Sequence, residues 1–541
     1  MKLRADLHKV RPDMLSKAVV LSLAVFMMIR ISMVYVIGEE GIGMLSAPLE
    51  VYILGCAVFL YSYERAVDSM IRLRSRRQQY QNADYGMKIA LRMAGLTGLI
   101  SGIAVILLSG VLAGNVFGMQ KAFMAFAVSG ICLILMSIQG AMRGYLQGFG
   151  AAASVLRSMI LQAVFSFVLS WILAQLFYRY GLRMNALLRV EDCAPAYGAL
   201  GAMTGIALSL FISLIHVAIG YRLRRRQIQD QIDNGAPRYL DAHIGIGRNL
   251  RSMIAVTMGF GLLTLADEKI YFVFALLRGK KEEMVSNWGI YYGSFMSVVC
   301  IIALVCAVPF VKGCYHFCAQ VSHSDLVQAG EKLSSMIHNQ AVLLIPVTAF
   351  TAILAEPIQT AFFGIPNDSA VAMTSFGSMT VLLASFALIA SCIMLRLHRM
   401  EALIMNTVLA FAVHVAIVLI MTIAGGFGLH ADILAMMGML AVYDAVTLLE
   451  LSRIIHYHQE WLRSFAVPLI SAGAGALVVY FLNGALVGII GEILSIVVCA
   501  VVGMTVYLII LTALKGINEY ECYEIPGGTL FVRFARKMHL M

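Results

Sequence analysis

Charged side chains are scarce in this sequence of 541 residues. Asp, Glu, Lys and Arg make up 13% of it and hydrophobic types 60%, whereas soluble domains carry about 25% charged residues. This balance excludes a soluble globular protein and a disordered one. The ten cysteines are scattered without paired spacing, which predicts reduced, apolar packing residues rather than a disulfide framework.

The sequence also lacks the short motifs of common enzymes. It contains no hydrolase constellation, no Walker phosphate loop and no Rossmann dinucleotide fingerprint. Without an ATP site, the energy for any movement must come from an ion gradient, the membrane potential or removal of a product. We therefore predict that the protein is not an enzyme and has no resident cofactor or metal, with Na⁺ or H⁺ coupling left open.

Long apolar runs dominate the sequence instead. A helix of about 20 residues crosses the hydrocarbon core of a bilayer. Every backbone polar group needs a partner there, so such runs predict helices. We count fourteen runs, at 14–37, 46–70, 89–112, 121–141, 153–178, 198–221, 252–277, 287–311, 335–356, 370–395, 401–424, 430–453, 464–484 and 489–514. The predicted fold class is an all-α polytopic membrane protein with 14 transmembrane helices.

Lysine and arginine gather in alternate loops of this predicted path. They are dense in the N-terminal tail, at 65–88 and at 222–251, and sparse in the loops between these segments. Because cytoplasmic loops carry the excess of Lys and Arg, both termini are predicted to be cytoplasmic. The net charge of +10 therefore reflects topology. The RLRRR cluster at 222–226 is expected to face anionic membrane lipids, and no nucleic-acid partner is expected.

The apolar runs also repeat weakly. Arg30-Ile31-Ser32 in the first run matches Lys269-Ile270-Tyr271 in the seventh, and two later pairs of segments match in the same order. The offset is roughly 240–250 residues each time, as expected of an internal repeat. We predict an N-lobe at 1–228 (six helices), a C-lobe at 229–460 (six helices), and an extra helix pair with a cytoplasmic tail at 461–541.

Four stretches resemble one transporter superfamily. They are IGEEGIGMLSAP (37–48), RGYLQGFG (143–150), AEPIQTAFFG (355–364) and LKGINEYECYEIPGG (514–528). Together they resemble the multidrug/oligosaccharidyl-lipid/polysaccharide (MOP) flippase superfamily. The resemblance is strongest to its polysaccharide-transporter branch, the stage V sporulation protein B-like proteins, and covers essentially the whole chain.

The resemblance implies two six-helix lobes in a V around a central cavity, two C-terminal helices and transport by alternating access. The implied cargo is a polyprenyl-linked saccharide, such as a lipid-linked oligosaccharide or a cell-envelope polysaccharide precursor, exported across the bacterial plasma membrane. Envelope-biosynthesis proteins are further expected partners. Arg143, Gly144 and Gly148 are expected to act as motif or hinge residues between the fourth and fifth helices.

A single arginine lies near the middle of the first run. A charge there costs roughly 2.5–3.5 kcal/mol on insertion scales, so Arg30 is expected to face protein or a water-filled cavity. A planar guanidinium suits phosphate oxygens, so Arg30 and Lys269 are predicted to bind the phosphates of the cargo. The alternative is that Arg30 pairs with an acid of the seventh helix as a latch between the lobes.

Three acids within apolar runs are candidates for ion coupling or for this latch: Asp267, Glu268 and Asp444. A buried carboxyl group takes up a proton more readily than an exposed one. At about 100° per residue, Asp267 and Lys269 point about 200° apart, so at least one of them should contact a neighbouring helix.

Two other functions stay open at this point. A cation-coupled multidrug or metabolite exporter on the same scaffold would depend on the three acids rather than on Arg30. A non-catalytic scaffold of an envelope export complex would tolerate changes at all of these charges.

Overall fold

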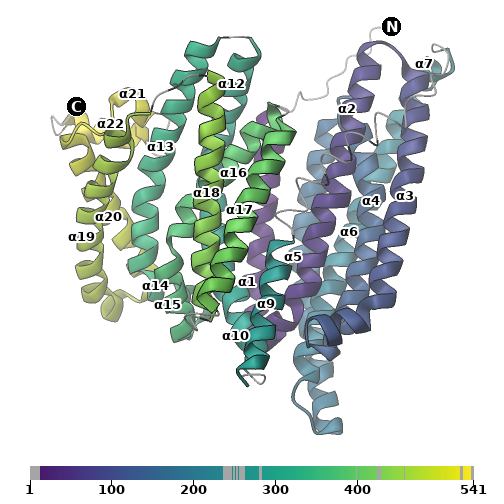
Figure 1. Ribbon diagram of the computed structural model, residues 1–541, viewed down its shortest axis with the longest axis horizontal. Coiled ribbons are helices and arrows are strands. Elements are labelled where there is room, and N and C mark those ends of the chain that lie inside the picture. Colours follow the sequence, from purple (N-terminus) through teal and green to yellow (C-terminus); the bar gives the residue numbers. More distant parts are fainter. Residues whose placement is uncertain are drawn as a thin grey trace. The chain divides into compact units, whose positions relative to one another are not determined.

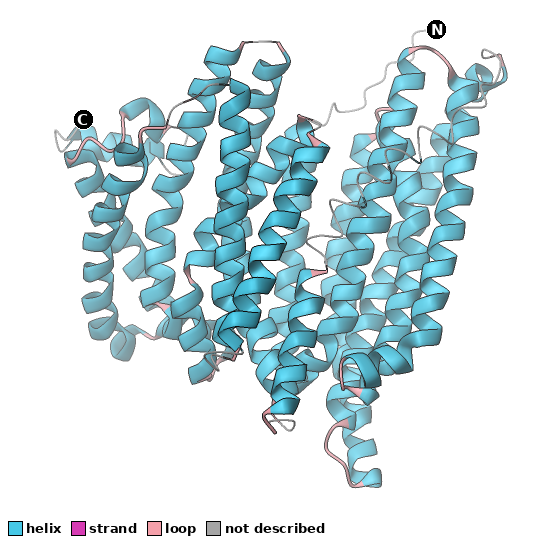
Figure 2. Ribbon diagram, viewed as in Figure 1, coloured by secondary structure: helices cyan, strands magenta, loops and turns pink. Residues whose placement is uncertain are grey.

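The computed structural model describes residues 12–234, 247, 250, 254, 262–279, 283–323, 325–397, 399–422, 428–455, 457, 459–523 and 528–537. Every regular element within these ranges is helical (Figure 2). Twelve segments of the described chain are long and apolar enough to cross a membrane. The predicted all-α membrane class is therefore confirmed, whereas the predicted number of fourteen spans is not.

The difference in number arises at two places. The first two expected spans belong to one candidate segment, Ala18–Arg76, because residues 39–45 are helical rather than part of a loop. A kink at Gly38, with φ at 73°, interrupts this segment. The seventh expected span, 252–277, lies partly outside the described residues, and only Leu263–Leu277 of it is a described helix.

The chain forms two compact units, Met1–Gly293 and Ser294–Met541. Unit 1 runs from purple to teal in Figure 1. Its helices are α1 (Pro12–Gly55), α2 (Ser62–Arg76), α3 (Tyr80–Val111), α4 (Phe123–Gly148), α5 (Ala152–Leu188), α6 (Cys193–Gln227), α7 (Gln229–Asp233), α9 (Leu263–Leu277) and α10 (Met284–Gly289). The predicted boundaries at 228 and 460 are not tested by this division and stay a prediction.

Unit 2 contains the remaining helices, drawn from teal to yellow in Figure 1. They are α11 (Met296–Ala307), α12 (Val311–Ser322), α13 (Leu326–Ile353), α14 (Ala355–Phe363), α15 (Asp368–Gly377), α16 (Met379–Arg396), α17 (Met400–Ile420), α18 (Leu429–Ile455), α19 (Val467–Ile490), α20 (Glu492–Ala513), α21 (Glu519–Cys522) and α22 (Gly528–Lys537).

The kink at Gly38 folds α1 back on itself. The Phe26 and Tyr52 rings stack at 5.5 Å across the two halves, and Arg30 reaches Glu50. The second half then crosses α10 closely, because a Cβ atom at Gly43 would clash with the carbonyl group of Val285. The GEEGIG stretch is therefore a helix-packing element, since small residues let two backbones approach.

Small residues also set the packing of α5 on α6. A Cβ atom on Gly201 or Gly205 would clash with the α5 backbone, and Ser166 and Ser209 exchange a hydrogen bond of 2.7 Å in the same contact. Helices in lipid associate through close packing and polar contacts of this kind, because lipid chains are as apolar as the helix surfaces.

Candidate functional site

Arg30 lies on α1 before the kink and is buried, with 3% of it exposed. Its Nη2 donates to Oε1 of Glu50, forming an ion pair. The hydroxyl group of Tyr292 donates to the same oxygen at 2.6 Å. The guanidinium carbon of Arg30 also lies 3.8 Å from the centre of the Tyr292 ring. Glu50 compensates the charge of Arg30, and Tyr292 adds a cation–π contact.

A second buried carboxylate lies near this pair. Oε1 of Glu268 is 2.8 Å from Oγ of Ser46, and Glu268 is fully buried. Ser46 precedes Glu50 by four residues, one helical turn, on the second half of α1. The structure therefore brings Arg30 and Glu268, two of the predicted site residues, into one polar cluster of unit 1.

Lys269, the next residue on α9, points away from this cluster. It donates from Nζ to the backbone carbonyl of Val116, just after α3. The different directions of Glu268 and Lys269 follow from the angle between successive helical residues. Asp267 is buried, with 4% of it exposed. The proposed roles of Lys269 in phosphate binding and of Asp267 in coupling stay predictions.

Unit 1 contains a cavity of about 360 Å³ close to the arginine pair. Its lining is mostly apolar. It includes Phe26, which lies one helical turn before Arg30, and Ile29, which directly precedes Arg30. Tyr52, two residues after Glu50, forms another part of the wall. The volume falls within the range of small-molecule sites.

Arg143 of α4 lies in the wall of this cavity and is 3% exposed. Its Nη2 donates to Oε1 of Gln162 at 2.7 Å and to Oγ of Ser213 at 3.3 Å. Gln162 in turn donates to the Tyr52 hydroxyl group at 3.1 Å. Among the described residues, no carboxylate lies within the 4.0 Å of an ion pair with Arg143, and its Nε has no hydrogen-bond partner.

Glu64 is the acid in the same wall and is 6% exposed. It interacts with Arg143 electrostatically, although the two do not form an ion pair. Neutral groups therefore orient the guanidinium group of Arg143, and Glu64 compensates its positive charge only from beyond ion-pair distance. Such an arginine keeps N–H donors available to an incoming anion.

Gly144 and Gly148, the predicted motif or hinge residues next to Arg143, pack α4 against α2. A Cβ atom on Gly144 would lie 2.5 Å from the carbonyl oxygen of Glu64, and one on Gly148 would lie 2.6 Å from Cβ of Ile71. With Gly140 they form a row at intervals of four residues, which is the spacing of one helix face. The row fixes where Arg143 points, and a hinge function stays a prediction.

Asp444 of α18 lies in unit 2, in the wall of a cavity of about 310 Å³. Both of its carboxylate oxygens are buried and have no hydrogen-bond partner among the described residues. The lining is largely apolar and includes the rings of Phe386, Trp461 and Phe465, of which Trp461 and Phe465 stack at 5.3 Å. A carboxylate in such surroundings is costly unless it is protonated or meets a cation.

No protein-family model matches the sequence, and a search of curated proteins finds no match. Solved structures do match. An inward-facing multidrug resistance MATE family transporter of the MOP superfamily gives a TM-score of 0.59 at 14% identity, covering 80% of this chain and 95% of that one. A MOP superfamily transporter from Pyrococcus furiosus gives a TM-score of 0.55 at 15% identity, covering 82% and 96%. The chain has the fold of MOP superfamily transporters.

An outward-facing MATE family structure also matches this MOP fold, with a TM-score of 0.54 at 15% identity, covering 81% of this chain and 95% of that one. The predicted superfamily fold is thus confirmed. These likenesses do not distinguish the polysaccharide branch from the multidrug branch, so the branch stays a prediction.

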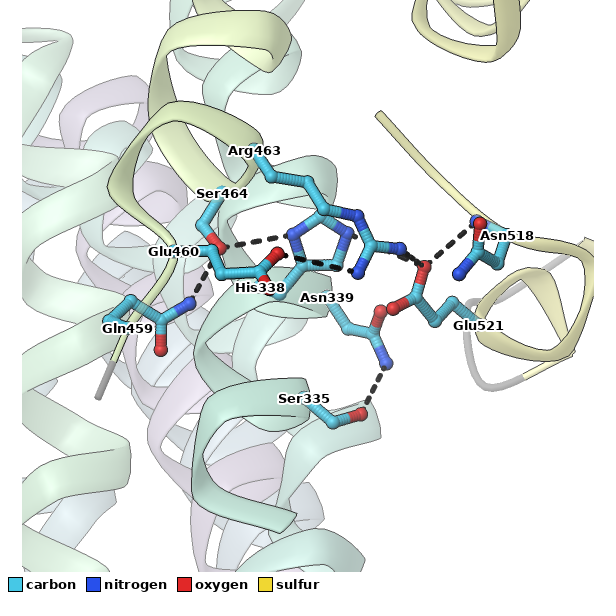
Figure 3. A network of polar contacts seen from close by, with 9 residues as sticks. All are labelled: Ser335, His338, Asn339, Gln459, Glu460, Arg463, Ser464, Asn518 and Glu521. Carbon is cyan, nitrogen blue, oxygen red and sulfur yellow. Dashed lines mark hydrogen bonds and ion pairs between the residues drawn. The ribbon is translucent and has the colours of Figure 1, made fainter. Parts of the chain in front are cut away.

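A polar network joins the C-terminal tail to the MOP fold at one end of unit 2 (Figure 3). Glu521 of α21 accepts from Nη2 of Arg463 at 2.5 Å and from the backbone N–H of Asn518 at 2.8 Å. His338 of α13 lies 3.7 Å from Glu521 and 3.2 Å from the hydroxyl group of Ser464. One carboxylate therefore anchors the tail to the middle of α13 and to the helical turn Leu462–Ala466 that precedes α19.

Sequence reasoning missed several polar residues of unit 1. Glu50 is an acid within the apolar run 46–70, and the rule that intramembrane charges are functional or paired was sufficient to find it. Gln162 and Ser213 give no such signal, because uncharged polar side chains are common in membrane helices. Their roles depend on which helices meet, and that information comes from the fold.

Proposed function

We propose that the protein is an alternating-access transporter that moves a lipid-linked oligosaccharide or cell-envelope polysaccharide precursor across the bacterial plasma membrane, with both termini in the cytoplasm. The MOP fold supports a transporter. The observation that carries the proposal is Arg143, a buried arginine in a cavity wall with no carboxylate at ion-pair distance among the described residues. Such a group favours an anionic cargo.

Arg30 takes a different role in this proposal from the one that the sequence favoured. Its ion pair with Glu50 means that a cargo phosphate must compete with a carboxylate. A ligand that binds one arrangement of such a pair better than another shifts the equilibrium between them. Cargo binding near Arg30 would thereby couple to movement of α1, with Asp267 and Glu268 as candidates for Na⁺ or H⁺ coupling.

The test is reconstitution of the purified protein with defined polyprenyl-diphosphate saccharides, with and without pH and sodium gradients. The expected result is protein-dependent movement of the saccharide between leaflets, accelerated by one gradient. Vesicles in which the saccharide stays in its original leaflet under every gradient contradict the proposal. Envelope-biosynthesis enzymes that make or consume the saccharide are the expected partners.

A second function, the export of organic cations, is favoured by the cavity of unit 2. Both oxygens of Asp444 lack hydrogen-bond partners among the described residues, and three aromatic rings line the same cavity. A carboxylate and aromatic faces suit a desolvated cation. In the same vesicles, uptake of a lipophilic cation that depends on Asp444, without saccharide movement, supports this function over the first.

A further inference from the structure

We propose that the cavity of unit 1 is a subsite for the phosphate and adjoining hydrocarbon chain of an amphipathic anion, with Arg143 as the phosphate ligand. The inference rests on the proposed function, because it names the part of the cargo that this cavity takes. The saccharide lies outside the cavity.

The lining decides against a sugar in the cavity. A saccharide carries many hydroxyl groups, and each one that enters an apolar site without a partner loses its hydrogen bonds to water. The walls are mostly apolar, with few polar side chains, among them Arg143, Gln162, Tyr52 and Glu64. A hydrocarbon chain gains from such walls, and a single anionic group suits one arginine.

The contacts of Arg143 favour a phosphate group. Gln162 and Ser213 hold Nη2 at 2.7 and 3.3 Å, which orients the guanidinium group without neutralising it. Among the described residues only Nη2 makes hydrogen bonds. Nε has no partner but is covered by neighbouring atoms, so Nη1 is the donor left for an anion. In a water-poor site these charge-assisted bonds are stronger than in water.

The cavity has an open side. Val19 and Leu23 of α1 line it and are 36% and 40% exposed. A chain longer than the cavity, which holds about 360 Å³, leaves it past these two apolar side chains. The subsite therefore takes the phosphate and the first part of a long lipid rather than the whole molecule.

Glu64 gives the subsite a property that a purely structural role of Arg143 would not produce. Its carboxylate shares the wall with Arg143 and repels an entering anion. Replacing Glu64 with Gln removes this repulsion while keeping the shape of the side chain. We therefore expect tighter anion binding from this variant, by several-fold to about tenfold.

The experiment measures binding of a labelled long-chain polyprenyl monophosphate to the full chain in nanodiscs of neutral lipid. Arg143→Gln is expected to weaken binding by about tenfold or more, and Arg143→Lys by less, because lysine keeps the charge without the planar fork. The matched control is Arg157→Gln on α5. Arg157 is exposed and, within the described part of the chain, bonds only to its own helix, at Ala153, so its variant should bind as wild type does.

Unlabelled competitors test each half of the ligand. Polyprenyl phosphate is expected to compete, whereas polyprenol and inorganic phosphate compete at least about tenfold more weakly. If polyprenol competes as strongly as polyprenyl phosphate does, the proposed role of Arg143 is wrong. Inorganic phosphate competing equally overturns the role of the hydrocarbon. If Arg143→Gln fails to fold, unchanged or weaker binding by Glu64→Gln overturns the subsite instead.

The subsite and the proposed function fail in different ways. Saccharide movement that persists in a folded Arg143→Gln variant with unchanged lipid binding refutes the subsite and leaves the transport function standing. Arg143-dependent binding of polyprenyl phosphate in a protein that moves no saccharide supports the subsite and refutes the transport function.

Discussion

Replacing Gly144 with Ala tests whether the glycine row on α4 positions Arg143. The new Cβ atom would lie 2.5 Å from the carbonyl oxygen of Glu64 and 2.8 Å from Cβ of Val67, which is closer than atoms pack. Both neighbours belong to a buried helix contact, so α2 must move. Overpacking of this kind costs about 1–3 kcal/mol, whereas Gly→Ala in a helix gains up to about 1 kcal/mol.

The expected net loss for Gly144→Ala is therefore about 1–2 kcal/mol in the free energy of unfolding, measured by denaturant titration in mixed micelles. Gly95→Ala and Gly110→Ala are matched controls on α3, because a Cβ atom at either position meets no atom of the described residues within 4 Å. They should be neutral or stabilising. A Gly144→Ala protein as stable as these controls would refute the close approach of α4 to α2 and with it the fixed position of Arg143.

Three further predictions concern buried ionisable groups. Glu50→Gln removes the carboxylate partner of Arg30, so we expect a loss of about 3–5 kcal/mol, read as a lower melting temperature; an unchanged melting temperature contradicts the pair. Asp444→Asn removes a charge that has no hydrogen-bond donor among the described residues, so its melting temperature should equal or exceed that of wild type. A marked fall would contradict this reading of Asp444. Cys522 is 1% exposed, and its burial together with two nearby acids raises the pKa of its thiol to about 11. Because the thiolate is the reactive form, maleimide should label this cysteine slowly at neutral pH. Glu521→Gln should release the tail and speed this labelling, and equal rates in the two proteins argue against the anchor.

The fold class was predictable because it depends on composition. Long apolar runs with little charge dictate membrane helices wherever they occur. The number of spans was harder to predict. The sequence suggests a loop at 38–45, whereas in the structure only Gly38 separates two helical stretches. Glycine adopts a positive φ without strain. One such residue can therefore end a helix and let the next begin at once in another direction, with no loop between them.

The candidate site was predictable only in part. Arg30 and Glu268 stand out as charges in apolar runs, and the structure does place them in one polar cluster. Arg143 also stood out, as part of a motif, but its place in a cavity wall depends on Gln162 and Ser213 from α5 and α6. Pairings between helices distant in sequence are not encoded in any local pattern, so the sequence indicated the residues but not their partners.

The nature of the cargo is the central claim, and one comparison tests it most directly. Proteoliposomes with wild-type, Arg143→Gln or Arg157→Gln protein are given a labelled polyprenyl-diphosphate saccharide and, separately, a lipophilic cation. The account predicts that wild type and Arg157→Gln move the saccharide, that Arg143→Gln loses most of this activity, and that none of them moves the cation. Movement of the cation alone, unaffected by Arg143→Gln, would contradict the account.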